Sequence, residues 1–125
     1  MISLDLRDKR PIYEQIAEKL KEQMALGILT ENTQLPSVRA FAVDLSINPN
    51  TIQRAYAELE RQGYIYSIKG KGNFVAQTEH LRDLRIDEVR EHILEVLDEA
   101  RQLGLKDADI IALIRKTAAQ TEAVE

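Results

Sequence analysis

The sequence predicts a mainly α-helical fold of the α+β class, with an N-terminal domain of residues 1–78 followed by a two-helix arm of residues 79–125. Apolar residues recur at helical spacing in several segments, which predicts helices. Two short β-rich runs flank a glycine-containing turn, which predicts a hairpin. The balance of charge also changes between the two parts, as expected of parts with different tasks.

The first helix is predicted over residues 11–26. Pro11 suits a first helical position, and Gly27 supplies a C-terminal stop. The apolar face recurs every four residues: Ile12, Ile16, Leu20 and Met24. A polar turn is predicted over residues 30–34.

Two further helices follow with only a short turn between them. Ser37 is the predicted N-cap of a helix over residues 38–45, and Arg39 points outward from it. Asn48 is the predicted cap of the next helix, whose first position is Pro49. The apolar stripe of that helix is Ile52, Ala55, Tyr56 and Leu59.

A hairpin with a basic tip is predicted after these helices. Residues 64–68 and 73–76 are the two β-rich runs, and Lys69-Gly70-Lys71-Gly72 lies between them. Tyr13 and the other tyrosines are interpreted as core or edge packing groups.

The arm begins after a polar junction at residues 77–80. One helix is predicted up to Gly104 and another from Asp107, with a tail over 117–125 that is expected to fray. The arm's apolar stripe could cover the N-terminal domain or its own partner helix. Two helices of this length make a poor independent core, so we expect a symmetric homodimer. Its predicted interface is Val89, Ile93, Val96, Leu97, Ala100, Leu103, Ile110, Ile111 and Ile114.

The charge is unevenly divided along the chain. The whole chain has a formal net charge of −4. Residues 1–78 hold 10 Lys and Arg against 9 Asp and Glu, whereas residues 79–125 hold 7 against 12. The acidity therefore belongs to the arm, and the whole-chain charge is a poor guide to what the first part binds.

Several classes of protein are not supported by the sequence. There is no cysteine, the N-terminus has no apolar signal region, and no apolar run approaches the roughly 20 residues of a membrane span. A cytoplasmic protein is expected. No set of catalytic groups is visible, so no enzyme activity and no cofactor are expected. His80 and His92, with the scattered carboxylates Asp83, Glu88 and Glu95, match no metal-binding pattern.

The helix order predicts binding to double-stranded DNA. A short helix, a brief turn and a polar-faced second helix form a helix-turn-helix, and the second helix presents its N-terminal residues to base edges in the major groove. Asn50 and Gln53 could each bond an adenine edge, and Arg54 a guanine edge or a phosphate. Lys69 and Lys71 in the hairpin add phosphate contacts, so the outline is a winged helix.

Four stretches resemble the DNA-binding domain of GntR-family transcription regulators: LPSVR (35–39), NPNTIQRAY (48–56), ELERQGYI (58–65) and GKGNFV (70–75). PIYEQI (11–16) matches the first helix of that family, and the short two-helix arm resembles the YtrA-like subfamily. The resemblance implies DNA contacts by Arg39, by the start of the recognition helix and by the wing. The complete predicted set is Ser37, Arg39, Asn48, Pro49, Asn50, Thr51, Gln53, Arg54, Lys69, Gly70, Lys71 and Gly72.

Two copies related by a two-fold axis would read an inverted-repeat operator. The resemblance also implies a repressor that blocks polymerase and controls genes for membrane transporters. Many members have arginine where this chain has Pro49 and Gln53, so base preference cannot be transferred from them. Two alternatives remain open: a winged-helix module that binds protein, and a ligand-gated sensor with a site at the dimer interface. The small-molecule effector is not identified by the sequence.

Overall fold

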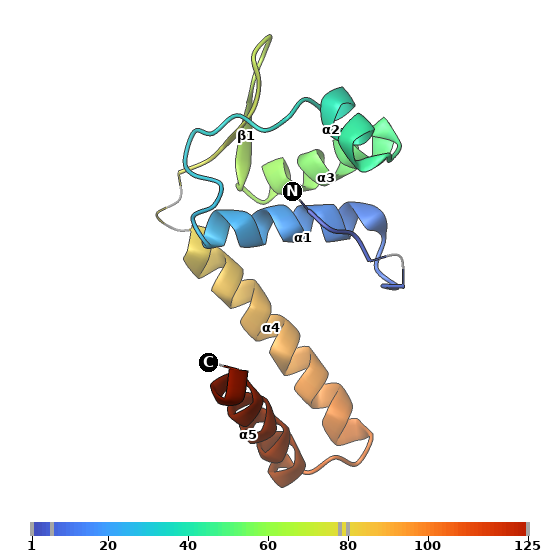
Figure 1. Cartoon of the computed structure of the whole chain (residues 1–125), viewed down its shortest axis with the longest axis vertical. Coiled ribbons are helices and arrows are strands. Elements are labelled where there is room, and N and C mark those ends of the chain that lie inside the picture. Colours follow the sequence, from blue (N-terminus) through green and yellow to red (C-terminus); the bar gives the residue numbers. More distant parts are fainter. Residues whose placement is uncertain (1, 6, 78, 80, 125) are drawn as a thin grey trace. The chain divides into compact units, whose positions relative to one another are not determined.

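The computed structural model describes residues 2–5, 7–77, 79 and 81–124 of the chain. Its elements, drawn in Figure 1, are α1 (Ile12–Ala25), α2 (Val38–Leu45), α3 (Pro49–Arg61), β1 (Ile65–Ile68), β2 (Gly72–Val75), α4 (Leu81–Gln102) and α5 (Asp107–Val124). The mainly α-helical α+β fold predicted from the sequence is confirmed.

The chain divides into two compact units, Met1–Ile86 and Asp87–Glu125. This division falls inside α4. The boundary after residue 78 stays a prediction, and residues 78 and 80 of that junction lie outside the described residues. Leu81 is only 2% exposed and belongs to the core of the first unit. Arg85 also reaches Glu22 of α1, with 3.7 Å between the charged groups.

In the first unit, α3 packs against both α1 and α2. All four residues of its predicted apolar stripe are buried, and they meet Ile16 and Leu20 of α1 and Phe41 of α2. The rings of Phe41 and Tyr56 stack with their centroids 6.2 Å apart. The removal of these apolar side chains from water is the main force that holds the three helices together.

The turn between α2 and α3 is fixed by local signals. The Ser37 hydroxyl accepts a hydrogen bond from the amide of Ala40 at 3.1 Å, so it caps α2 as predicted. Asn48 accepts from the amide of Asn50 at 2.9 Å, and Pro49 takes the first position of α3. Ser46 ends α2 in the left-handed conformation with φ 55°, which permits the sharp change of direction.

A buried tyrosine ties α3 to the segment that leads into α2. The Tyr56 hydroxyl donates to the carbonyl oxygen of Pro36 at 2.8 Å. Burial raises the pKa of Tyr56 above its ordinary value, so the hydroxyl stays protonated and remains a donor. This bond fixes the start of α2 relative to α3.

The hairpin gains a third chain segment that the sequence did not predict. β1 and β2 are antiparallel, with Ile65 opposite Val75 and Ile68 opposite Gly72. Residues 32–35, which fall largely within the predicted polar turn, run along β2 and exchange three backbone hydrogen bonds of 2.8–2.9 Å with Asn73 and Val75. The side chains of this segment are polar and show no strand-like pattern. The pairing forms all the same, because an edge segment needs only backbone groups to join a sheet.

The second unit contains most of α4 together with α5, joined by a turn in which Gly104 has φ 92°. Most of the apolar residues predicted for a dimer interface are exposed, among them Leu103 at 78%, Ile114 at 62% and Ile93 at 51%. Leu97, Ala100 and Ile110 are half-buried. The arm therefore leaves a large part of its apolar surface uncovered within one chain.

The end of the arm differs from the expected frayed tail. α5 continues to Val124, so residues 117–124 are helical. The segment is rich in alanine, which has the highest helix propensity. The hydroxyls of Thr117 and Thr121 donate to carbonyl oxygens one turn back, at 2.8–3.2 Å, and so do not compete with the helix.

Candidate nucleic-acid interface

The first two turns of α3 present polar side chains to solvent. Asn50, Gln53 and Arg54 are exposed, and Thr51 is half-buried. They are outward because the apolar stripe of the same helix is turned into the core. The N-terminal end of a helix also carries free N–H groups and a partial positive charge, which favour an anion such as a phosphate.

Arg54 is held by an aromatic side chain of α1. Its guanidinium lies over the ring of Tyr13, 4.0 Å from the ring centroid. The two residues, with Pro11, Ile12, Asn50 and Thr51, line a shallow depression of about 400 Å³ between the first turns of the two helices. The interpretation of Tyr13 as a packing residue was therefore incomplete, since its ring also orients a candidate DNA contact.

The start of α2 supplies two predicted site residues. Arg39 is exposed at the second position of the helix. Ser37 is exposed as well, but its hydroxyl already accepts the capping hydrogen bond. Ser37 therefore positions the helix N-terminus. Arg39 is the residue of the two whose side chain can extend toward a ligand.

The wing tip is the turn Lys69-Gly70-Lys71-Gly72, in which both lysines are exposed. Gly70 and Gly72 have φ 79° and 127°, values that favour glycine. The amide of Lys71 donates to the carbonyl oxygen of Ile68 at 2.9 Å, which closes the turn. The side-chain amide of Gln34 donates to the carbonyl oxygen of Lys71 at 2.8 Å.

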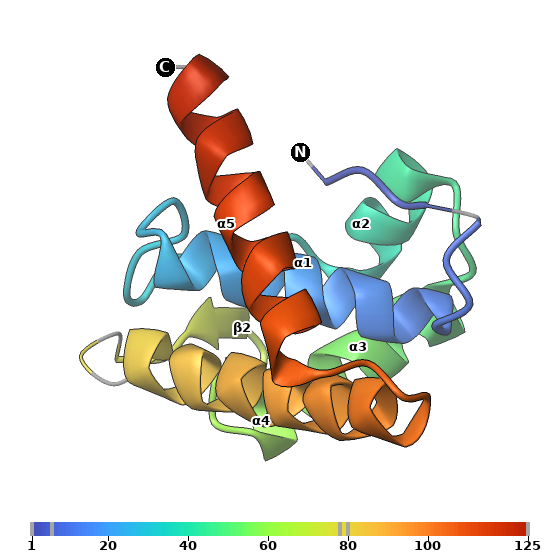
Figure 2. The same cartoon turned by 90° about the horizontal axis from the view of Figure 1, so that it is seen from below.

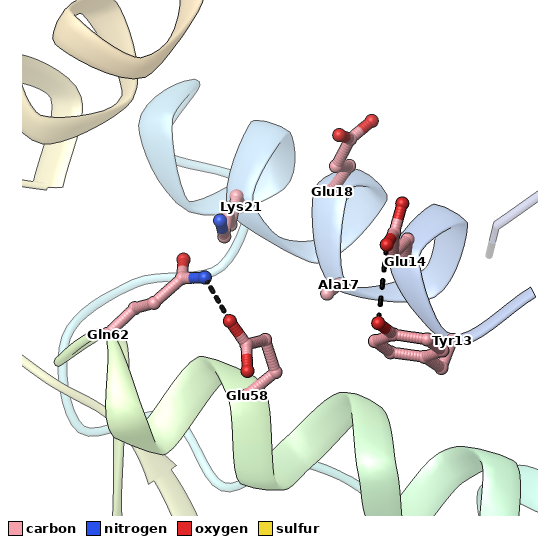
Figure 3. A pocket seen from close by; sticks show the side chains of 7 residues that line it. All are labelled: Tyr13, Glu14, Ala17, Glu18, Lys21, Glu58 and Gln62. Atoms are coloured by element: carbon pink, nitrogen blue, oxygen red, sulfur yellow. Dashed lines mark hydrogen bonds between the residues drawn. The ribbon is translucent and has the colours of Figure 1, made fainter. Parts of the chain in front are cut away.

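The C-terminal half of α3 presents carboxylates that are paired with cations. Glu58 and Gln62 face Glu14, Glu18 and Lys21 of α1 across a pocket of about 220 Å³ (Figure 3). Hydrogen bonds from Arg61 and Gln62 lower the pKa of Glu58 to about 2, so this carboxylate stays ionised. Arg61 forms an ion pair with Glu58, one turn earlier in the helix. Lys21, Arg10 beside Glu18 and Arg61 beside Glu58 offset these carboxylates, so this half of α3 has no strong charge of either sign.

Seen from the direction of Figure 2, α1 and α3 run beside each other, in agreement with their packing. This arrangement is what places Tyr13 beside Arg54. Sequence reasoning could not find this pair or the bond from Gln34 to Lys71, because each joins residues far apart in the chain. The spacing of residues around Tyr13 and around Gln34 gives no indication of the partner that each one contacts.

Other kinds of site have no support in the part of the chain that the structure describes. Within it, no group of three His, Cys, Asp or Glu residues could hold a metal ion; His80 lies outside the described residues. Among the described helices, none is long and apolar enough to cross a membrane.

Known proteins resemble this chain over most of its length. The profile described as "Bacterial regulatory proteins, gntR family" matches residues 12–75. The HTH-type transcriptional repressor YtrA of Bacillus subtilis (strain 168) is 32% identical over 124 residues, which cover 98% of this chain and 95% of YtrA. The resemblance thus includes the arm as well as the winged helix.

Solved structures support the same relationship. A crystal structure of a transcriptional antiterminator from Listeria monocytogenes EGD-e superposes with a TM-score of 0.76 at 38% identity, covering 94% of this chain and 90% of that one. The DNA-binding domain of AraR in complex with operator ORE1 has a TM-score of 0.52 at 27% identity, covering 59% of this chain and 90% of that one. The profile match, the full-length relative and the shared winged helix lead to one conclusion: the chain belongs to the GntR family of bacterial regulatory proteins, resembles YtrA and is a DNA-binding transcription regulator.

Proposed function

We propose that the chain is a homodimeric repressor that binds an inverted-repeat operator and blocks access of RNA polymerase to a promoter. The observation that carries this proposal is the exposed start of α3, where Asn50, Gln53 and Arg54 project beside a helix N-terminus. Amide and guanidinium groups at this position suit base edges in the major groove. The name of YtrA as a repressor supports the direction of regulation.

Each part of the interface has a separate role in the proposal. Gln53 and Asn50 read bases, because an amide can bond an adenine edge in two places. Arg54, pre-oriented by Tyr13, contacts a guanine edge or a phosphate. Arg39 and the wing lysines contact phosphates and so set register and orientation. The residues around them in the predicted set shape the backbone: Ser37, Asn48, Pro49, Thr51, Gly70 and Gly72.

The arm is proposed to form the dimer. Apolar side chains as exposed as Leu103, Ile114 and Ile93 are costly in water, and a two-fold partner covers the same surface on both copies at once. The remaining members of the proposed interface are Val89, Val96, Leu97, Ala100, Ile110 and Ile111. A two-fold dimer reads two half-sites separated by about one helical turn or a multiple of it.

The proposal includes no catalytic step and no cofactor. The protein would act where bacterial DNA lies, in the cytoplasm. Genes for membrane transporters are the proposed targets by resemblance to the YtrA-like subfamily. The protein-binding alternative differs from the proposal in predicting no salt-dependent affinity for duplex DNA.

Base reading and phosphate contact make different predictions. Gln53→Ala should cost about 1–3 kcal/mol at one base pair and relax specificity there. Lys71→Ala should weaken binding to all sequences alike and lower the salt slope by about 1. Affinities would be measured by fluorescence anisotropy across a salt series, on an operator that the wild type selects from a random pool and on random duplex.

Lys19→Ala is the matched control for loss of a lysine, since Lys19 is exposed on α1 away from α3. Its affinity and salt slope should equal those of the wild type. Equal losses on operator and random duplex for Gln53→Ala would contradict its assignment to base reading. A wild type with no salt-dependent affinity for any duplex would favour the protein-binding module.

The stacking of Arg54 on Tyr13 predicts that Tyr13→Leu weakens operator binding by about two- to fivefold, because a cation–π contact at an exposed site contributes about 0.5–1 kcal/mol. Tyr13→Phe keeps the ring and should bind like the wild type. The Tyr13→Leu change should have no further effect in an Arg54→Ala background. A full additional loss in that background would mean that Tyr13 acts independently of Arg54.

The dimer predicts that Ile114→Asp yields monomers in analytical ultracentrifugation, because a charge would be buried in an apolar interface without a partner. Operator affinity should fall by about a hundredfold or more, since two linked half-sites bind far more tightly than one. Gln120→Asp, on the same helix but off the apolar stripe, should remain dimeric. An Ile114→Asp protein that sediments as the wild type does would place the interface elsewhere.

A further inference from the structure

The wing tip is joined to the segment that precedes α2 by one side chain. Gln34 lies on the segment 32–35, which pairs with β2, and its side-chain Nε2 donates to the carbonyl oxygen of Lys71 at 2.8 Å. Ser37, the N-cap of α2, follows three residues later in the chain. A single short segment therefore touches the tip of the wing and leads directly into the helix that carries Arg39.

The space around Gly72 is fitted to this contact. A Cβ atom added to Gly72 would lie 2.9 Å from Nε2 of Gln34, which is closer than such atoms approach in real structures. Gly72 also has φ 127°, a conformation that other residues rarely adopt. The glycine thus permits the amide of Gln34 to cross the start of β2 and reach the carbonyl of Lys71.

The hairpin constrains its own tip in part: Ile68 is paired with Gly72, and the Ser67 hydroxyl donates to the side chain of Asn73 at 2.8 Å. Its turn contains two glycines, and its own closing bond is the one from Lys71 to Ile68. The base of the hairpin is better braced, because Tyr66 stacks on Phe74 and its hydroxyl donates to Asn32 at 2.7 Å. The bond from Gln34 adds a constraint on the turn that comes from outside the hairpin.

We propose that Gln34 is a positioning residue of the DNA interface: by holding the carbonyl of Lys71, it fixes the direction in which the wing lysines meet the phosphate backbone and couples the wing to the N-terminus of α2. The inference rests on the proposed role of the wing in DNA binding. Ordering a glycine-containing turn at the moment of binding costs conformational entropy, and a turn that is already ordered avoids this cost. Gln34 is uncharged and acts through Lys71.

The test uses the full-length protein and a duplex operator selected from a random pool by the wild type. Gln34→Met keeps the length of the side chain and removes the donor. We expect about a two- to tenfold weaker operator affinity, the effect of one hydrogen bond. Because a neutral residue is changed, an accompanying fall in the salt slope would report loss of the lysine contact, and a purely structural role would not produce it.

A double-mutant cycle separates action through Lys71 from direct contact with DNA. The Gln34→Met/Lys71→Ala protein should lose less affinity than the product of the two single losses, because the Lys71 side chain is part of what Gln34 positions. Losses that multiply would mean that Gln34 contacts DNA by itself, which overturns the inference. The matched control is Gln102→Met, which also removes an exposed amide hydrogen bond, to Asp98 in α4, and should leave affinity unchanged.

The outcomes distinguish this inference from the proposed function. Wild-type affinity for Gln34→Met, with a clear loss for Lys71→Ala, overturns the inference and leaves the wing contact standing. Wild-type affinity for Lys71→Ala removes the wing contact and the inference with it. A lower melting temperature for Gln34→Met with an unchanged salt slope would assign the bond to stability alone and overturn the inference.

Discussion

The burial of one face of α3 is the constraint on which the rest of the structure depends. Ile52, Ala55 and Leu59 have no measurable exposure, and Tyr56 is only 2% exposed. Because successive residues of a helix are rotated by a fixed angle, burying this stripe leaves Asn50, Gln53 and Arg54 outside. The same packing brings α1 alongside α3, so that Tyr13 meets Arg54. The hydrophobic core and the candidate interface therefore have one origin.

The two halves of α3 expose different chemistry. The first half of the helix combines amide and guanidinium groups with the positive end of the helix dipole. The second half faces a pocket lined by Glu14, Glu18 and Glu58. The arm is acidic as well, with 12 Asp and Glu against 7 Lys and Arg in residues 79–125. A net charge of −4 does not prevent a chain from binding a polyanion, because the local surface that meets the polyanion can differ in charge from the whole chain.

The sequence predicted the parts of the fold that depend on neighbouring residues. The bounds of α2 and the caps at Ser37 and Asn48 follow from local hydrogen-bonding chemistry, and the structure confirms them. It did not predict the pairing of residues 32–35 with β2, the burial of Leu81 or the contacts made by Tyr13 and Gln34. Each of these joins segments far apart in the chain, and no periodicity or motif records such a meeting. The candidate DNA contacts were all named from the sequence, whereas the contacts of Arg54 with Tyr13 and of Lys71 with Gln34 were not.

The most direct test of the central claim is the affinity of the purified full-length protein for the DNA upstream of its own gene, compared with a scrambled duplex, across a salt series. A sequence-specific regulator should prefer its operator by more than about a thousandfold, with log affinity falling linearly in log salt concentration. Equal and weak binding to both duplexes would place the operator elsewhere in the genome. Absence of binding to any duplex at low salt would contradict the account, because the exposed start of α3 and the wing would then serve some partner other than DNA.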